Sequence, residues 1–330
     1  MLFPFWYILW GVKIVDYRKI IKFGNSSHVV SLPKTWLEKN NLKKGDSLFF
    51  EENENQDLVL SSKPKGKTEK KEILINADKK EVDRVIADVI AAYVNNYNII
   101  KIKGKDLSNV NKEIKNVLND FVAVEIVEES PNIIIAKDFL DINEFTQKDL
   151  IRKIDLTTRS MIEDSIKCVE KKKFENLTKR DKEVNKLTFL IYKISKNALK
   201  DPEILNKLGI KSVHLVTDWM AVSNIEKLAD ETKRISKFVK CKKLTDEQSK
   251  ELSMIYKEME KYFKDVMKAF YNKDKNLAHS IIANYRVLTK KCDDYFEKHY
   301  EPVIGNIVEK LKGIATRVRN IARIIVYHED

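Results

Sequence analysis

The sequence predicts a multidomain, predominantly helical protein with a β-rich N-terminal domain, a small α/β domain and a C-terminal pair of three-helix bundles. Three observations predict this order. Only 8 of the 330 residues are Gly and 6 are Pro, too few for an all-β chain with many tight turns. Short strand-like runs, separated by turn residues, are confined to residues 16–141. From residue 142 onward, apolar residues recur at spacings of three and four, the period of an amphipathic helix.

Residues 1–15 form an apolar lead-in, of which Met1 to Trp10 reads MLFPFWYILW. This run is too short to cross a hydrocarbon core, which needs about 20 residues, and it lacks the basic region and cleavage site of a secretory signal. We expect no integral membrane span. Two interpretations stay open: an unstructured lead-in or artefact of start-site choice, and a docking tag for a membrane surface or another subunit.

Residues 16–62 alternate between short strands and turns. The expected elements are strand Arg18–Phe23, turn Gly24–Ser27, strand His28–Leu32, helix Lys34–Asn40 after Pro33, and a hairpin of strands Ser47–Glu51 and Leu58–Leu60. A chain of this size hides only about 60% of the surface that it exposes when unfolded, and its strands leave open edges. We therefore expect this domain to pair with a copy of itself.

The run KFGNSSHVVSLPKTW, residues 22–36, followed by NLKKGD, residues 41–46, resembles the AbrB/SpoVT family of swapped-hairpin DNA-binding domains. The likeness spans nearly all of residues 16–62. It implies a homodimer in which two chains interleave into one small barrel and present basic residues to DNA.

Basic and small polar side chains in this domain are the candidate DNA contacts. They lie on the first strand, the turn and the start of the helix: Arg18, Lys19, Lys22, Asn25, Ser26, His28 and Lys34. The cations could neutralise phosphates, and the Asn and Ser side chains could reach phosphates or base edges. An ordinary solvated basic face, with Asn and Ser serving only the turn, is the alternative.

A polar run, SSKPKGKTEKK, predicts a linker at residues 63–71, and an α/β connector domain follows at residues 72–141. Its expected elements are strand Glu72–Asn76, helix Lys79–Asn95, strand Asn98–Lys103, helix Leu107–Asp120, and strands Val122–Val127 and Asn132–Ala136. The connector has no glycine-rich phosphate loop and no Cys/His cluster. We expect it to be a spacer or dimerisation domain.

Residues 142–330 are expected to be almost purely helical. The expected helices are Glu144–Lys173, Asn176–Leu199, Ile210–Val239, Asp246–Tyr271, Asn276–Phe296 and Pro302–Tyr327. Thr245 and Gln248 form a capping-box pattern at the start of the fourth. Six helices fall into two groups of three, which predicts two consecutive three-helix bundles.

Acidic residues at helical spacing form a candidate metal site in the first of these bundles. Glu226 and Asp230 are four residues apart and project from one face, and Asp181 on the preceding helix could converge with them. Oxygen ligands in that number suit a divalent cation. The alternative is that Glu226 and Asp230 only form ion pairs with Lys227, Lys233 or Arg234.

The run NIEKLADETKRIS, residues 224–236, resembles the E-R-I-G-D-H-A-x-N-I-A signature of the PhoU family of phosphate-uptake regulators. RDKEVNKL, residues 180–187, resembles that family's D-x-x-V-N element. The likeness covers the chain from about residue 144 onward and implies that Asp181, Glu226 and Asp230 bind a divalent metal, iron or zinc, at a single site. Lys312 and Thr316 stand where a second site would need carboxylates, so none is expected in the second bundle.

Net charge and residue usage favour a nucleic-acid-binding protein over an enzyme. The chain has 62 Lys and Arg against 50 Asp and Glu, and the excess of +12 favours an anionic partner such as nucleic acid. Three isolated cysteines suit a reducing cytoplasm. The histidines are scattered and the chain has no serine-elbow or P-loop motif, so we expect no enzyme.

The three-part order is similar to that of archaeal PhoU-type regulators. This resemblance implies a cytoplasmic, dimeric transcription regulator that binds promoter DNA and controls phosphate uptake and homeostasis. The alternative function is a non-DNA-binding adaptor that docks on the ATPase subunit of the phosphate transporter and inhibits it, with the β-rich domain serving only to dimerise it.

Overall fold

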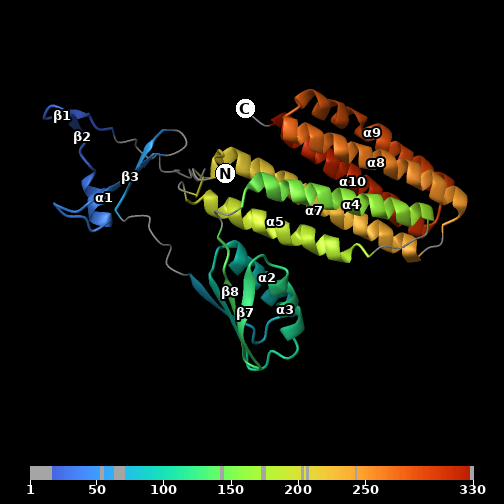
Figure 1. The fold of residues 1–330 in the computed structure, drawn as a ribbon, viewed down its shortest axis with the longest axis horizontal. Helices are drawn as coiled ribbons and strands as arrows, with labels where there is room; N and C mark the ends of the chain where they lie inside the picture. Colours follow the sequence, from blue (N-terminus) through green and yellow to red (C-terminus); the bar gives the residue numbers. More distant parts are fainter. Residues whose placement is uncertain are drawn as a thin grey trace, which may run out of the picture. The chain divides into compact units, whose positions relative to one another are not determined.

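A computed structural model of the chain describes residues 17–52, 56–62, 71–141, 145–171, 176–201, 204–205, 208–241 and 244–327. The chain divides into two compact units, Met1–Lys67 and Thr68–Asp330, whose elements are drawn in Figure 1. The division falls inside the predicted linker. The apolar stretch Met1 to Trp10 and residues 63–70 of the linker lie outside the described residues.

The first unit contains two antiparallel hairpins and a short helix. Its elements are β1 (Ile21–Phe23), β2 (Ser27–Val29), α1 (Lys34–Lys39), β3 (Phe49–Glu52) and β4 (Leu58–Ser61). Strand β1 pairs with β2, and β3 pairs with β4. Pro33 is the N-cap residue of α1 with a φ of −63°, so the ring fixes the angle at which the chain enters the helix. The β-rich N-terminal region that the sequence predicts is confirmed.

The second unit begins with a four-stranded mixed sheet and two helices. Its elements are β5 (Glu72–Asn76), α2 (Val82–Val94), β6 (Ile99–Lys103), α3 (Asn111–Asn119), β7 (Val124–Ser130) and β8 (Ile133–Asp138). The strand order is β5-β6-β8-β7. Strands β5 and β6 are parallel with α2 as their crossover, whereas β8 runs antiparallel to both its neighbours. Helices α2 and α3 pack on each other and on the sheet, which buries an apolar core between the two layers.

Long helices make up the rest of the second unit. They are α4 (Gln147–Lys171), α5 (Thr178–Ala198), α7 (Ser212–Cys241), α8 (Asp246–Asn272), α9 (Lys275–Lys298) and α10 (Pro302–Tyr327). The first three pack on one another, as do the last three, and the two groups meet where α7 contacts α10 and α4 contacts α8. The predicted pair of three-helix bundles is confirmed. Within the described residues, every helix is too short or too polar to cross a bilayer.

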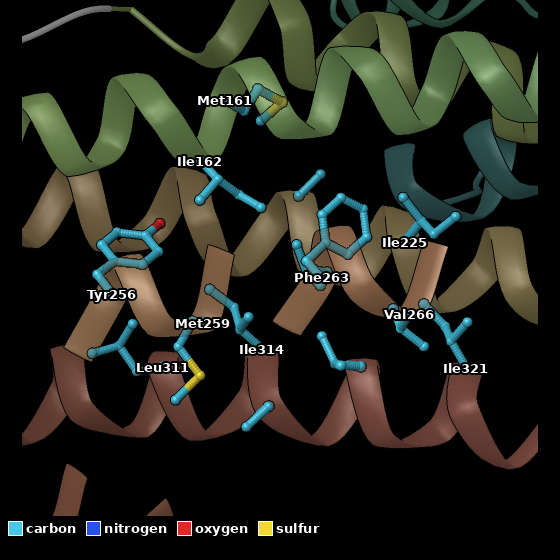
Figure 2. Close-up of a cluster of buried hydrophobic side chains, with 14 of the residues drawn as sticks. Met161, Ile162, Ile225, Tyr256, Met259, Phe263, Val266, Leu311, Ile314 and Ile321 are labelled. Atoms are coloured by element: carbon cyan, nitrogen blue, oxygen red, sulfur yellow. The ribbon is translucent and has the colours of Figure 1, made fainter. Parts of the chain in front are cut away.

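The two bundles share one core. Figure 2 shows Met161 and Ile162 of α4, Ile225 of α7, Phe263 of α8 and Ile314 of α10 directed into the same space. All five are at most 1% exposed. Burying side chains of this size stabilises the fold by about 1.5–3 kcal/mol each, so this shared core holds the two bundles together.

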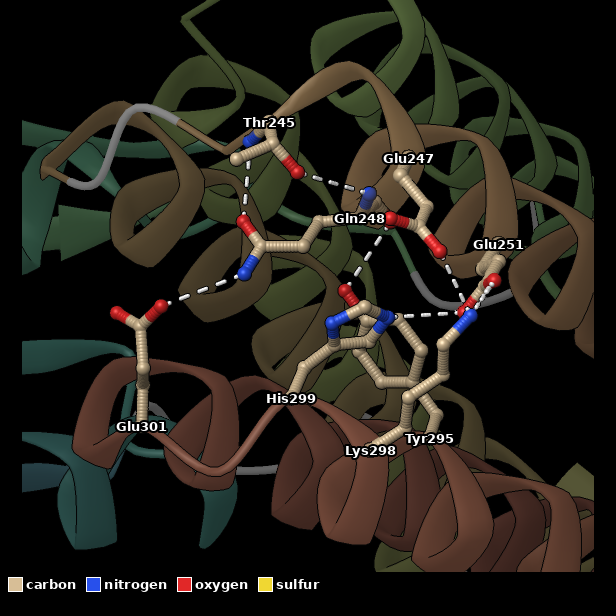
Figure 3. A network of polar contacts seen from close by, with 8 residues as sticks. All are labelled: Thr245, Glu247, Gln248, Glu251, Tyr295, Lys298, His299 and Glu301. Carbon is tan, nitrogen blue, oxygen red and sulfur yellow. Dashed lines mark hydrogen bonds and ion pairs between the residues drawn. The ribbon is translucent and has the colours of Figure 1, made fainter.

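The predicted capping box at Thr245 is confirmed and belongs to a wider polar network (Figure 3). The Thr245 hydroxyl accepts a hydrogen bond from the backbone N–H of Gln248 at 3.2 Å, and the Gln248 side chain accepts one from the backbone N–H of Thr245 at 3.0 Å. The Gln248 amide also donates to Glu301 at 3.3 Å, and the Tyr295 hydroxyl donates to the Gln248 carbonyl at 3.1 Å. The start of α8 is therefore tied to the end of α9 and the start of α10.

Helix α5 joins the helical bundles to the α/β layer. Lys193 of α5 forms an ion pair with Asp138 at the end of β8, and both side chains are buried. The Lys193 ammonium also lies 4.3 Å from the centre of the Tyr93 ring. Phe189 of α5 packs edge-on against Phe121, with ring centres 6.0 Å apart. The sheet and the bundles are consequently parts of one unit.

Candidate functional site

The β1–β2 hairpin has one polar face and one apolar face. Lys22 lies directly opposite His28 in the antiparallel ladder, and Ile21 lies opposite Val29. Because successive side chains alternate between the two faces of a strand and directly opposed residues share a face, Lys22 and His28 project together. Ile21, Phe23 and Val29 project from the other face. The hairpin therefore separates its basic side chains from its apolar ones.

A tight turn joins the two strands. Gly24 has a φ of +70°, a region that residues with a Cβ rarely adopt, and Asn25 and Ser26 follow it in the turn. Both predicted polar contacts are thus at the exposed tip of the hairpin. Their side chains are available either to the turn backbone or to a ligand.

The remaining predicted DNA contacts lie on both sides of the hairpin. Arg18 and Lys19 lie two to three residues before β1, and Lys34 is the first residue of α1. The ion pair of Lys34 with Glu38, at 3.7 Å, joins two exposed side chains and contributes at most about 1 kcal/mol. All seven predicted residues are exposed. Strand pairing places Lys22 and His28 side by side, whereas the other five predicted residues are close to them only in the sequence.

The apolar side chains of the first unit do not pack into a buried core. None of the residues described in 17–52 and 56–62 is buried. Phe23 is 69% exposed, Phe50 is 61% exposed and Leu58 is 65% exposed. Apolar side chains that a folded domain would normally bury therefore face solvent in the single chain.

The predicted metal ligands in the helical bundle do come close together. Asp181 of α5 is 5% exposed, and Glu226 and Asp230 lie on α7. Burial raises the pKa of Glu226, and the negative charges of Asp230 and Asp181 raise it further. The three carboxylates therefore interact electrostatically, as the helical spacing predicts.

A lysine already neutralises this carboxylate cluster. The Lys233 ammonium lies 2.7 Å from Asp181 and 2.9 Å from Asp230, and the Arg234 guanidinium lies 2.8 Å from Asp230. The ion pairs that the sequence offered as an alternative are thus formed, and Asp181 joins them. Hydrogen bonds to both carboxylates help raise the pKa of Lys233, although burial opposes this.

The residues as they lie do not fit a metal ion. An ammonium that bridges two of the carboxylates takes up the oxygen atoms that a divalent cation would need, and its charge would repel that cation. Among the described residues, no group of three or more His, Cys, Asp or Glu side chains has the arrangement of a metal site. The metal at Asp181, Glu226 and Asp230 stays a prediction that the geometry does not favour. The sequence offers Lys233 as an ion-pair partner of Asp230, three residues before it, but only the fold shows that Lys233 also reaches Asp181.

Comparison with known proteins gives a family match for the N-terminal segment and a structural match for the helical part. Residues 21–70 match the family described as antidote-toxin recognition MazE, bacterial antitoxin. This confirms that the N-terminal segment is a MazE/AbrB-like domain. The crystal structure of PhoU from Pseudomonas aeruginosa is similar to 55% of this chain over 94% of its own length, with 14% identity and a TM-score of 0.44. No curated protein matches the sequence.

Proposed function

We propose that this chain is a DNA-binding regulator of phosphate uptake and homeostasis rather than an enzyme. In this proposal, two copies of the N-terminal domain form the DNA-binding part, and the helical bundles of the second unit respond to the phosphate supply. The single observation that carries the DNA-binding part is the division of the β1–β2 hairpin into a basic face and an apolar face.

The apolar face supports dimerisation. The N-terminal unit forms both hairpins, but it has no buried core of its own, because Phe23, Phe50 and Leu58 are exposed. A second copy brings an identical apolar face, so pairing removes both faces from water at about 25 cal/mol per Å² of apolar surface. The MazE/AbrB-like character of residues 21–70 supports the same arrangement.

The basic face supports DNA binding. Lys22 and His28 project from the side that dimerisation leaves free, and Arg18 and Lys19 precede them on the chain. In a dimer each of these side chains occurs twice. Several cations on one surface are what a protein needs to neutralise consecutive phosphates of a duplex.

The assignment to phosphate control rests on the two helical motifs, RDKEVNKL on α5 and NIEKLADETKRIS on α7. They lie side by side in the first bundle, where Asp181 and Asp230 share Lys233. The proposal assigns no metal to this cluster.

Titration of the full chain against a labelled duplex of random sequence, at several salt concentrations, tests the DNA-binding proposal. Affinity is expected to fall steeply as salt rises, because binding releases counterions from the phosphates. Arg18→Gln/Lys22→Gln is expected to reduce the slope of log affinity against log salt by about 3.6, or 0.9 for each of the four phosphates that a dimer then leaves unneutralised. Lys237→Gln/Lys240→Gln, two exposed lysines of α7, removes the same charge elsewhere and is expected to change the slope little.

A chain that does not bind duplexes, or a hairpin variant with the wild-type slope, contradicts DNA binding through this face. Capture of a transporter ATPase subunit without any duplex binding would instead support the adaptor function. The phosphate assignment has its own test, which is to sequence the genomic fragments that co-purify with the protein from cells grown with ample or scarce phosphate. Fragments upstream of phosphate-uptake genes are expected, and their absence under both conditions contradicts the assignment.

A further inference from the structure

A pocket of 440 Å³ lies in the helical part of the second unit. It is formed where α4 and α7 begin, where α8 turns into α9, and where α10 ends. A volume of this size is within the range of sites that bind small organic molecules, which is about 300–1,000 Å³. It lies apart in the sequence from the motifs that carry the proposed function.

The rim of this pocket is strongly basic. Four cationic side chains line it, against two carboxylates, and three elements supply these four: Lys148 and Arg152 from α4, Lys273 from the α8–α9 turn, and Lys275 from the start of α9. Among the ion pairs of the described residues, none involves these four cations. The charge of Lys148 partly offsets that of Asp218 in the pocket wall, and the remaining positive charge of the rim is available to a ligand.

The floor of the pocket is apolar and aromatic. Ile151 and Ile325 are buried at 2% and 4% exposure, and Phe270 is half-buried. The Tyr271 ring is held in place, because its hydroxyl donates a hydrogen bond to Asp155 at 3.0 Å and the Arg152 guanidinium lies 5.2 Å from its centre. A ligand in this pocket meets both aromatic and aliphatic surface and positive charge.

Two of the four cations, Lys273 and Lys275, lie only two residues apart, where α8 turns into α9. Lys273 ends α8 with a φ of 53°, a left-handed conformation in which Gly is the usual residue. Asp274 then caps α9 by accepting a hydrogen bond from the Leu277 N–H at 2.9 Å. A tight turn of this kind places Lys273 and Lys275 on the same rim.

We propose that this pocket binds a small organic phosphate of mononucleotide size, with the phosphate group among the lysines and a flat ring over the apolar floor. Inorganic phosphate alone would leave the floor uncovered, and a neutral ring system would leave the cations unpaired. Such binding goes beyond the proposed function and does not depend on it, since the pocket's residues belong to the helical part and not to the hairpin unit.

Isothermal titration calorimetry of the full chain with the four nucleoside monophosphates tests the proposal. At least one is expected to bind, and both its nucleoside and inorganic phosphate are expected to bind about tenfold more weakly or worse. Lys148→Gln/Lys275→Gln is expected to weaken binding about tenfold, because two cations leave the rim. Asp218→Asn is expected to tighten it about threefold, because a negative charge leaves the pocket wall.

Lys250→Gln/Lys290→Gln is the matched control. It removes two exposed lysines from the distant parts of α8 and α9 and is expected to leave the affinity unchanged. Thermal melting of each variant, followed by circular dichroism, shows that the bundles remain folded. The proposal is overturned if no nucleoside monophosphate binds, if the nucleoside or phosphate alone binds as tightly, or if the pocket variant binds like the wild type.

Discussion

At the scale of single residues, Lys193 and Asp138 fix the α/β layer to the helical bundles. The Lys193 side chain is fully buried and that of Asp138 is 2% exposed. Burial lowers the pKa of Lys193, and the neighbouring Asp138 charge opposes that shift. The pair therefore sits in a dry environment, where the loss of one partner leaves an uncompensated charge.

Lys193→Ala is expected to destabilise the second unit by about 3–5 kcal/mol, the cost of leaving a buried carboxylate without its partner. Chemical denaturation followed by circular dichroism measures this as a lower midpoint. Lys200→Ala, an exposed lysine just beyond α5, is expected to change stability by less than about 0.5 kcal/mol. Asp138→Asn/Lys193→Met is expected to recover part of the lost stability, because no unpaired charge is then buried. Equal midpoints for Lys193→Ala and Lys200→Ala would contradict a stabilising role of the Lys193–Asp138 ion pair.

The carboxylate cluster shows what residue spacing can and cannot predict. Helical periodicity placed Glu226 and Asp230 on one face, and their electrostatic interaction with Asp181 is found. The partner of Asp181 could not be predicted, because it depends on how α5 and α7 are set against each other along their axes. Only the fold shows that Lys233 is shared between Asp181 and Asp230.

Elemental analysis of protein purified without chelator tests whether the Lys233 ammonium occupies this cluster in place of a divalent metal ion. We expect wild-type protein and Glu226→Gln/Asp230→Asn to contain the same small amount of divalent metal, because Lys233 already neutralises the site. If the wild type contains one metal ion per chain and the variant contains none, this expectation is contradicted. The metal site that the resemblance implies would then be present.

At the scale of elements, the ends of two long helices were predictable from the residues that mark helix boundaries. Helix α10 has the bounds that the sequence predicts, Pro302–Tyr327, and α8 begins at the predicted Asp246. Two other ends differ where a single residue adopts a left-handed backbone conformation. Lys79 has a φ of 59°, so α2 starts only at Val82, and Ala123 has a φ of 57°, so β7 starts at Val124. Lys and Ala rarely adopt positive φ, so the sequence does not predict this conformation at either position.

Thr245→Ala is expected to destabilise the helical bundles by about 1 kcal/mol, because it removes the side-chain acceptor of the capping box. Thermal or chemical denaturation measures this loss. Ser280→Ala is a suitable comparison, since its hydroxyl donates to a carbonyl of the same helix and its removal is expected to cost less than about 0.5 kcal/mol. An unchanged stability for Thr245→Ala would show that Gln248 is held by Tyr295 and Glu301 without the cap.

At the scale of the whole molecule, the order of domains follows from the sequence but the basic pocket does not. Strand alternation, helical periodicity and turn residues each report on neighbours within a few positions of the chain. The pocket brings together residues from Lys148 to Ile325 at the ends of several helices. Its lysines are indistinguishable in the sequence from those of any solvated helix surface.

The two units also differ in what holds them together. The helical bundles contain an extended buried core, whereas the described part of the N-terminal unit buries no side chain. A domain of this size needs additional burial to be stable, and a second copy is the simplest source. Under the proposed function, we therefore expect DNA binding by the hairpin to depend on dimerisation through its apolar face.

The molar mass of the full chain in solution, measured by light scattering over a range of concentrations, tests this dependence most directly. We expect twice the mass of one chain for the wild type and for Asn25→Asp, a charge change in the turn, away from the apolar face. Phe23→Asp is expected to dissociate into single chains, because it places a charge on that face. A monomeric wild type, or a Phe23→Asp variant that stays dimeric, would contradict dimerisation through the hairpin.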